Sequence, residues 1–325
     1  MRDHTLVPPN PNATGTLLTL RQQIKLYALI AIMVACWAGN FIVGKVALKE
    51  WPPFPLAAVR VTVAALILLA IFALSRQGIR NAPDGPGAPA LSSTVAHRDW
   101  LKWAELGLYG VALNQVFFVL GLNYTSVAHS ALIISLGPIL VLVIARLKGL
   151  EAFTAGKIIG MALSFAGVTF LVLEHGLSFH TGTLRGDLLT FLGSFSFALY
   201  TVASKEVAAR YTSLEMNTFS FLAGALLILP IGIPTLIGFN WARISWRGWA
   251  SLLYMSVFAS VVAYLIFYYA LKFISASRVV AFSYLHPVLA TLGGVILLGE
   301  PVTHHLVVGG SAVLAGVYLA ERNHR

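Results

Sequence analysis

Residues 127–168 read VAHSALIISLGPILVLVIARLKGLEAFTAGKIIGMALSFAGV, and the same pattern returns 149 residues further along the chain. Extended outward, residues 110–172 align with 259–321 without a gap and share twelve identical positions. The identities include proline, glycine and glutamate, as at Pro138 and Pro287, so chance similarity between apolar runs explains them poorly. The chain therefore contains an internal repeat, and that repeat decides the fold.

Composition indicates the solvent that surrounds the chain. The sequence is 58% hydrophobic and only 10% charged, whereas water-soluble domains carry roughly 25% charged residues. Most of the surface must therefore face lipid. The net charge of +10 comes from basic residues spread over short loops rather than gathered in one patch, so no nucleic-acid partner is expected. The single Cys36 leaves no intramolecular disulfide and no cysteine-based metal site.

The apolar runs have the length of membrane-spanning helices. About 20 residues cross a bilayer as a helix, and a helix satisfies its own backbone hydrogen bonds in lipid. The runs are too long for strands and lack alternation with a period of two. We therefore predict an all-α integral membrane protein with ten spans. These spans cover residues 24–44, 54–74, 101–121, 126–146, 156–173, 184–204, 215–238, 247–271, 278–298 and 304–320.

The first parts of the two halves are also related, more weakly, at an offset of 160, as at Lys45 and Lys205. Each half then holds five spans. Because five is odd, the second half runs through the membrane upside down relative to the first. The sequence predicts ten transmembrane helices arranged as two inverted-topology five-helix repeats, residues 24–173 and 184–320, which is a common architecture for a transporter.

The distribution of lysine and arginine predicts the orientation. With the N-terminus inside, sixteen basic residues fall in cytoplasmic segments and five in outer segments, as the positive-inside rule requires. Both termini are expected to be cytoplasmic, in a bacterial inner membrane. Residues 1–23 are expected to form a disordered cytoplasmic tail, and residues 75–99 a flexible cytoplasmic loop rich in turn-forming residues.

Two stretches resemble a known family. Trp37-Ala38-Gly39-Asn40-Phe41, followed by Lys45 and Arg60, resembles the opening of an EamA-type repeat of the drug/metabolite transporter superfamily. Ser283-Tyr284-Leu285-His286-Pro287-Val288, followed by Leu298-Gly299-Glu300-Pro301, resembles the close of that repeat. The resemblance covers residues 24–320. It implies a ten-helix, two-repeat fold and the transport of a small solute such as an amino acid, another metabolite or a drug.

Polar groups at membrane depth are costly, so each one requires a reason. His286 lies near the middle of the span 278–298, beside Pro287, which frees a backbone carbonyl one turn earlier. An imidazole at this place can bind a substrate carboxylate or carry a proton. The alternative is a neutral histidine that is hydrogen-bonded between helices.

Amides and aromatic rings complete the candidate binding site. Asn40, Asn114 and Gln115 offer donors and acceptors without charge, which suits a zwitterionic or neutral solute; their alternative role is to join helices. Flat faces with a polar tip come from four aromatic candidates. These are Trp37, Tyr200, Tyr264 and Tyr284.

Other polar and special residues are expected to be structural or to act in gating. Arg60, Pro138 and Pro287 are the candidates for this role; the alternative for Arg60 is that its side chain snorkels to the outer interface. Lys45 and Lys205 are expected to anchor helix ends at the membrane interface.

Residues typical of helix capping and close helix packing also occur in the repeated segments. Glu151 and Glu300 stand just before helix starts, where capping and the helix dipole stabilise a carboxylate. The small residues Gly156 and Gly160 allow close helix packing, within one chain or between two, so a monomer and a homodimer are both left open. His304 and His305 are neighbours on a helix and point in different directions, so no metal site is expected.

The preferred hypothesis is a secondary transporter, an exporter of small organic metabolites (amino acids or amphipathic drugs) that works by alternating access. No Walker motif is present, so no ATP cofactor is expected. A nucleotide-sugar or sugar-phosphate carrier is the alternative; several lysines, among them Lys45, Lys205 and Lys272, would then face the cavity. A membrane-embedded enzyme would need a catalytic constellation, and the sequence contains none.

Overall fold

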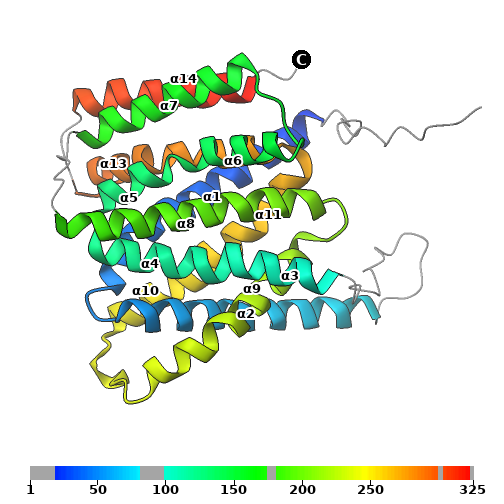
Figure 1. Cartoon of the computed structure of the whole chain (residues 1–325), viewed down its shortest axis with the longest axis vertical. Helices are drawn as coiled ribbons and strands as arrows, with labels where there is room; N and C mark the ends of the chain where they lie inside the picture. The colour runs from blue at the N-terminus through cyan, green and yellow to red at the C-terminus, as the bar shows by residue number, and fades with distance from the viewer. Residues whose placement is uncertain (1–18, 81–98, 174–180, 299–302, 323–325) are drawn as a thin grey trace, which may run out of the picture.

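Long apolar runs form helices in every part of the chain that the computed structural model describes, which is residues 19–80, 99–173, 181–298 and 303–322 (Figure 1). No strand occurs in these residues. The elements are α1 (Leu20–Ala47), α2 (Pro53–Arg80), α3 (Trp100–Leu106), η2 (Gly107–Leu113), α4 (Asn114–Tyr124), α5 (Val127–Ile134), α6 (Gly137–Leu147), α7 (Ala155–Leu173), α8 (Thr181–Val207), α9 (Ser213–Leu236), η3 (Trp241–Arg243), α10 (Trp246–Ser256), η4 (Val257–Val262), α11 (Ala263–Phe273), α12 (Ala276–Ala281), η5 (Phe282–Tyr284), α13 (Leu285–Leu298) and α14 (His304–Arg322).

Eight helical runs of 19 to 28 residues in the described ranges are long and apolar enough to cross a membrane. The predicted all-α integral membrane class is therefore confirmed. The expected spans 278–298 and 304–320 are also helical but fall outside this group of eight. The first is divided among α12, η5 and α13, and α14 carries two histidines at its start and charged residues at its end.

The expected N-terminal tail is too long. Residues 20–23 belong to α1, because the Thr19 side chain accepts a hydrogen bond from the Gln22 backbone while the Gln22 side chain accepts one from the Thr19 backbone. Likewise, residues 75–80 continue α2 rather than starting a loop. Residues 1–18 of the predicted tail, residues 81–98 of the predicted loop, and Glu300 lie outside the described residues.

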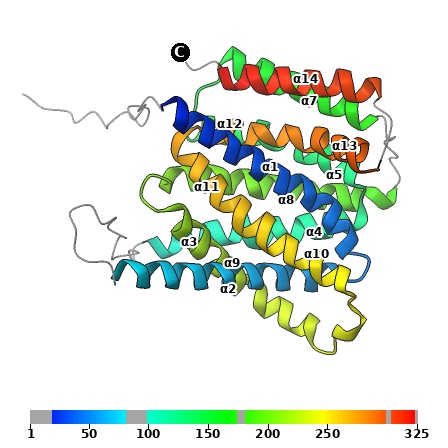
Figure 2. The same cartoon turned by 180° about the vertical axis from the view of Figure 1, so that it is seen from behind.

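Corresponding helices of the two halves lie side by side. Figures 1 and 2 show α7 along α14 at one end of the molecule and α2 with α9 at the other, with the remaining helices stacked between these pairs. The α7–α14 contact depends on small residues. A Cβ atom added to Gly316 would lie 2.5 Å from the Gly160 carbonyl oxygen, and one on Gly309 would lie 2.8 Å from the Gly167 carbonyl oxygen. These glycines therefore pack helices within one chain.

Two segments of π-helix interrupt the regular helices at matching places in the two halves. These are η2, between α3 and α4, and η4, between α10 and α11. A π-helical turn shifts the hydrogen-bond pattern and is frequent at functional sites. Side chains from other helices bond to the carbonyls of η4: Trp37 Nε1 donates to Ala259 O at 3.1 Å, and Asn217 Nδ2 donates to Val261 O at 3.1 Å.

Lys45 and Lys205 each cap the C-terminal end of a helix, a contact that the sequence analysis did not predict. Lys45 Nζ donates to Thr125 O at 2.6 Å, just past α4. Lys205 Nζ donates to Leu271 O at 2.5 Å and to Ile274 O at 2.9 Å, at the end of α11. Thr125 and Ile274 are themselves 149 residues apart. The same contact therefore occurs once in each half, where a cation satisfies the exposed carbonyls of a helix C-terminus.

Replacing Lys205 by methionine is expected to lower the free energy of unfolding by about 1–3 kcal/mol, because partly buried carbonyls lose a charged donor. The measurement is denaturant or thermal unfolding of the purified protein in detergent. Lys272→Met is the matched control, because Lys272 is exposed, and its effect should stay within about 0.5 kcal/mol. Equal effects of the two substitutions would contradict the capping role.

Candidate functional site

A cavity lies where the two halves meet, among α1, α2, α4, α8 and α11 and the broken helices α5–α6 and α12–α13. Its volume, counted as the space open to the centre of a water molecule, is about 100 Å³. The lining residues are Trp37, Asn40, Phe41, Arg60, Asn114, Gln115, Phe118, Ile134, Gly137, Thr190, Gly193, Ser194, Phe197, Tyr264, Val280, Ser283 and His286.

Two helix breaks shape one wall of this cavity. Pro138 is the second residue of α6, and Pro287 is the third residue of α13. A proline cannot donate to the carbonyl four residues earlier, which belongs to Ile134 in the first half and Ser283 in the second. Ile134 ends α5 and Ser283 lies in η5, and both line the cavity. The two prolines therefore occupy equivalent structural positions, as the repeat predicts.

A cluster of amide and tyrosine side chains forms another part of the cavity wall. Gln115 Nε2 donates to Tyr264 OH at 3.1 Å, and this hydroxyl lies 3.3 Å from Asn114 Oδ1 and from Gly110 O. Asn114 Nδ2 in turn donates to Gly193 O on α8 at 3.0 Å. Asn114 and Gln115 therefore join helices, as their alternative role predicts, and they also line the cavity.

His286 has no hydrogen-bond partner for either ring nitrogen among the described residues. Only 6% of the residue is exposed, and its ring packs beside Trp37 and Phe41, at centroid distances of 6.2 Å and 5.9 Å. The alternative interpretation, a neutral histidine hydrogen-bonded between helices, is therefore not supported by any partner among the described residues. Asn40 Oδ1, which lines the same cavity, also lacks a partner there. The site presents polar atoms whose hydrogen-bonding capacity is unused.

Arg60 is buried near the start of α2, with 2% of the residue exposed. The interpretation that its side chain snorkels to the outer interface is therefore wrong. Its Nε donates to Ser260 Oγ at 3.2 Å, and Ser260 belongs to η4. The π-helical segment thus presents a hydroxyl to a cation in the cavity wall.

The cavity gathers most of the residues that the sequence analysis selected. Six of the eight predicted binding residues line it: Trp37, Asn40, Asn114, Gln115, Tyr264 and His286. Tyr200 and Tyr284 do not. The Tyr200 hydroxyl donates to Tyr268 OH in the main core, and Tyr200 stacks on Phe267. Tyr284 packs into the core formed with α7 and α14, because successive residues of a helical turn point in different directions.

The sequence analysis missed the lining face of α8. Thr190, Gly193, Ser194 and Phe197 all line the cavity, and they follow the spacing i, i+3, i+4 and i+7 of one helix face. The small and hydroxyl-bearing residues at this spacing could therefore have predicted that this face of α8 lines the cavity. They suit a wall that a solute approaches closely, because they leave space beside α8.

Comparison with known families fits this geometry. The EamA-like transporter family matches residues 24–173 and 184–321, which are the two halves of the repeat. The chain belongs to the EamA-like transporter family. This transporter is 32% identical over 300 residues to an uncharacterized transporter of Archaeoglobus fulgidus, covering 91% of this chain and 96% of the relative. It is 27% identical over 294 residues to a protein of Streptantibioticus cattleyicolor named "probable terminal-alkyne amino-acid exporter", covering 90% and 92% of the two chains.

A solved crystal structure shares the fold of this EamA-like transporter. The TM-score is 0.69 at 18% sequence identity, and the match covers 91% of this chain and 96% of the other. At that identity the likeness concerns the fold alone. The relatives' names as transporters agree with the expectation that the chain is not an enzyme.

Proposed function

We propose that this EamA-like protein is a secondary transporter that exports small organic solutes by alternating access, with ten transmembrane helices in two inverted five-helix repeats. The observation that carries the proposal is the cavity at the meeting of the two halves, lined by polar atoms with unused hydrogen-bonding capacity. Substrate sites of transporters with inverted repeats lie at such an interface.

Contacts between equivalent residues support the symmetry. Gln115 and Tyr264 are 149 residues apart and bond to each other, and Ser164 Oγ donates to Val313 O at 3.3 Å over the same separation. Equivalent residues meet only near a two-fold axis. Five helices per repeat then require that this axis lie in the membrane plane.

The ends of the bundle support the proposed orientation. The start of α1 and the end of α14 lie on the same side of the bundle, the side at which these two helix ends meet (Figure 1). There the Tyr27 hydroxyl donates to the Glu321 carboxylate. An even number of crossings follows from this arrangement. The excess of basic residues there supports our proposal that this end faces the cytoplasm.

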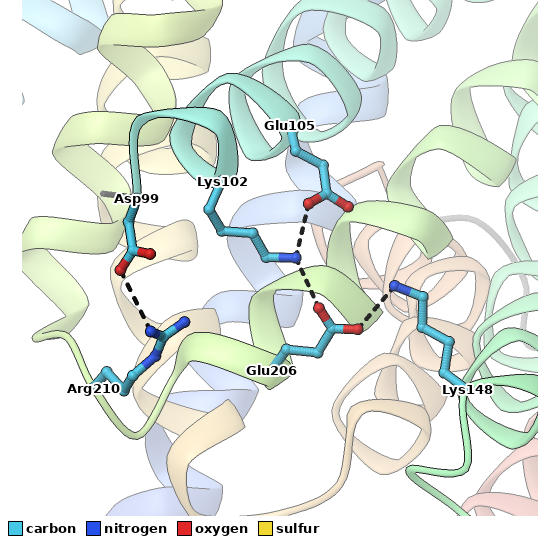
Figure 3. Close-up of polar contacts among 6 residues, drawn as sticks. All are labelled: Asp99, Lys102, Glu105, Lys148, Glu206 and Arg210. Carbon is cyan, nitrogen blue, oxygen red and sulfur yellow. Dashed lines mark hydrogen bonds and ion pairs between the residues drawn. The ribbon is translucent and has the colours of Figure 1, made fainter. Parts of the chain in front are cut away.

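Ion pairs join the halves at the proposed cytoplasmic end (Figure 3). Lys102 Nζ contacts Glu105 and Glu206 carboxylate oxygens at 2.7 Å each, and Lys148 Nζ contacts Glu206 at 2.8 Å. Lys102 and Lys148 come from the first repeat, whereas Glu206 comes from the second. This network holds the cytoplasmic ends of the halves together, and alternating access would require it to separate when the cavity opens inward.

The basic residues that line the cavity bear on the proposed class of substrate. Lys45, Lys205 and Lys272 are absent from its lining, which favours amino acids or amphipathic drugs over nucleotide sugars and sugar phosphates. The name of the Streptantibioticus cattleyicolor relative also supports an amino-acid substrate. Transport of labelled amino acids and cationic dyes by the purified protein in liposomes tests this proposal, with and without an imposed pH gradient. Absence of flux for both classes would overturn it.

His286→Ala is expected to weaken transport affinity on the order of tenfold, because a loss of 1–1.5 kcal/mol of hydrogen bonding corresponds to about that factor. Concentration-dependent flux in the same liposomes measures it. Tyr284→Phe is a matched control nearby in the chain, since Tyr284 does not line the cavity, and it should transport normally. Normal flux and affinity in His286→Ala would remove His286 from the site.

A further inference from the structure

The cavity wall contains a buried cation whose hydrogen-bonding capacity is only partly used. Arginine carries five N–H donors and stays charged in proteins. In Arg60, Nε bonds to Ser260, but Nη1 has no partner among the described residues. The side chain lines the cavity and is almost fully buried. Such a charge, held away from water, is strongly destabilising unless an anion accompanies it.

No carboxylate of the described chain provides that anion. None of the described acidic residues lines the cavity. Their carboxylates are engaged elsewhere, as Asp187 is with Thr125 and Glu151 is with Lys157. Among the described residues, the cavity wall therefore carries a positive charge and no negative charge that balances it.

We propose that Arg60 binds a carboxylate of the transported solute, which makes the substrate a small organic carboxylate with an apolar or aromatic body. This inference rests on the proposed transport function and names its substrate class. A guanidinium pairs with a carboxylate through two parallel hydrogen bonds. A phosphate carries more charge than one guanidinium balances, and Arg60 is the single lysine or arginine in the described lining of this cavity.

The remaining lining suits the rest of such a molecule. Trp37, Phe41 and Phe197 present aromatic surface to the cavity, which favours an apolar body. The unpartnered atoms of His286 and Asn40 can take a second polar group. An α-amino acid meets these conditions, because its carboxylate pairs with Arg60 while its ammonium lies over an aromatic face. A simple cationic amine finds no counter-charge here.

Equilibrium binding to the purified full-length protein in detergent tests the assignment, with intrinsic tryptophan fluorescence as the readout. The probes are phenylalanine, 3-phenylpropionate, phenylalaninamide and phenethylamine, which keep the aromatic body and differ in the carboxylate. The two carboxylates should bind on the order of tenfold to a hundredfold more tightly than the amide and the amine. Arg60→Gln should abolish this preference, and Arg60→Lys should keep part of it.

Arg146→Gln is the control, because it removes the same charge from an exposed position and should keep the preference for carboxylates. The probe series on the unaltered protein decides the question even if Arg60→Gln fails to fold. Equal binding of acid and amide, no binding of either carboxylate, or an unchanged preference in Arg60→Gln would overturn the proposal. Displacement of the acid by inorganic phosphate at equal affinity would also overturn it, in favour of a phosphate site.

Flux of the same four probes in liposomes separates this inference from the proposed function. Carboxylate-selective binding without flux would support the role of Arg60 and overturn the transport proposal. Flux without a preference for the carboxylates would support transport and overturn the role of Arg60.

Discussion

Glu151→Gln is expected to lower the free energy of unfolding by about 3–5 kcal/mol, because it leaves a buried lysine without its counter-charge. Glu151 Oε2 lies 2.6 Å from Lys157 Nζ, and the side chains are 6% and 2% exposed. The carboxylate also accepts a hydrogen bond from the Ser277 backbone at 3.0 Å and another from the Ser277 hydroxyl. An amide keeps the shape of the carboxylate but cannot neutralise Lys157.

The pH dependence of this effect has a definite sign. Burial raises the pKa of Glu151, but hydrogen bonds from Lys157 and Ser277 outweigh burial and hold the pKa below its usual value of 4.5. A carboxyl group whose pKa is lower in the folded state stabilises the protein fully above the unfolded-state pKa. That stability is lost as the pH falls through the folded-state pKa, below 4.5. Glu151→Gln should remove this part of the acid sensitivity.

Unfolding of the purified protein at neutral and acidic pH measures both effects. Glu206→Gln is the matched control, because its carboxylate is 29% exposed and bonded to Lys102 and Lys148 (Figure 3). An exposed pair contributes about 0–1 kcal/mol. If Glu151→Gln cost no more than Glu206→Gln, the buried pair would not have the proposed importance.

Gly316→Ala is expected to lower the free energy of unfolding by about 1–3 kcal/mol or more, because it overpacks the contact of α7 with α14. The added methyl would lie 2.3 Å from Ser164 Oγ and 2.6 Å from the Ser164 backbone nitrogen. The second of these atoms belongs to a helix backbone, so one helix must move away from the other. Thermal unfolding in detergent should show the loss.

Gly310→Ala provides the control on the same helix. The nearest atoms to its added methyl lie at 3.7 Å and 4.0 Å, which is ordinary contact. Alanine also has the higher helix propensity, by up to about 1 kcal/mol, so this variant should be as stable as the original or more stable. A Gly310→Ala variant less stable than Gly316→Ala would show that the close approach of α7 and α14 does not limit stability.

The sequence predicted the helical membrane class and most of the cavity because both depend on patterns with a known period. A polar side chain inside a long apolar run needs a reason to be there, and this argument alone selected Asn40, Asn114 and His286. Tyr200 and Tyr284 were selected as aromatic rings with a polar tip, but both pack into the core, since the direction of a side chain depends on which helices surround it.

Contacts between distant parts of the chain were beyond the reach of the sequence. Glu151 was expected to cap the helix that follows it, yet it bonds to the backbone of Ser277 in the other half. The π-helical segments η2 and η4 left no mark in composition, because side chains from other helices bond to their carbonyls. Trp37 and Asn217 bond to η4, and Tyr264 bonds to Gly110 of η2. The burial of Arg60 could not be predicted for the same reason, because its partner Ser260 is 200 residues away in the sequence.

The contact between α7 and α14 has the symmetry of a dimer interface. Gly160 and Gly309 are equivalent positions, and each one faces the backbone of the other repeat's last helix. A surface that fits a copy of itself is what a two-fold homodimer requires. The contact between α7 and α14 is therefore of the kind by which two copies of one half could pair. Because a single polypeptide carries both halves, equivalent positions can differ, as Gly137 in the first half and His286 in the second do.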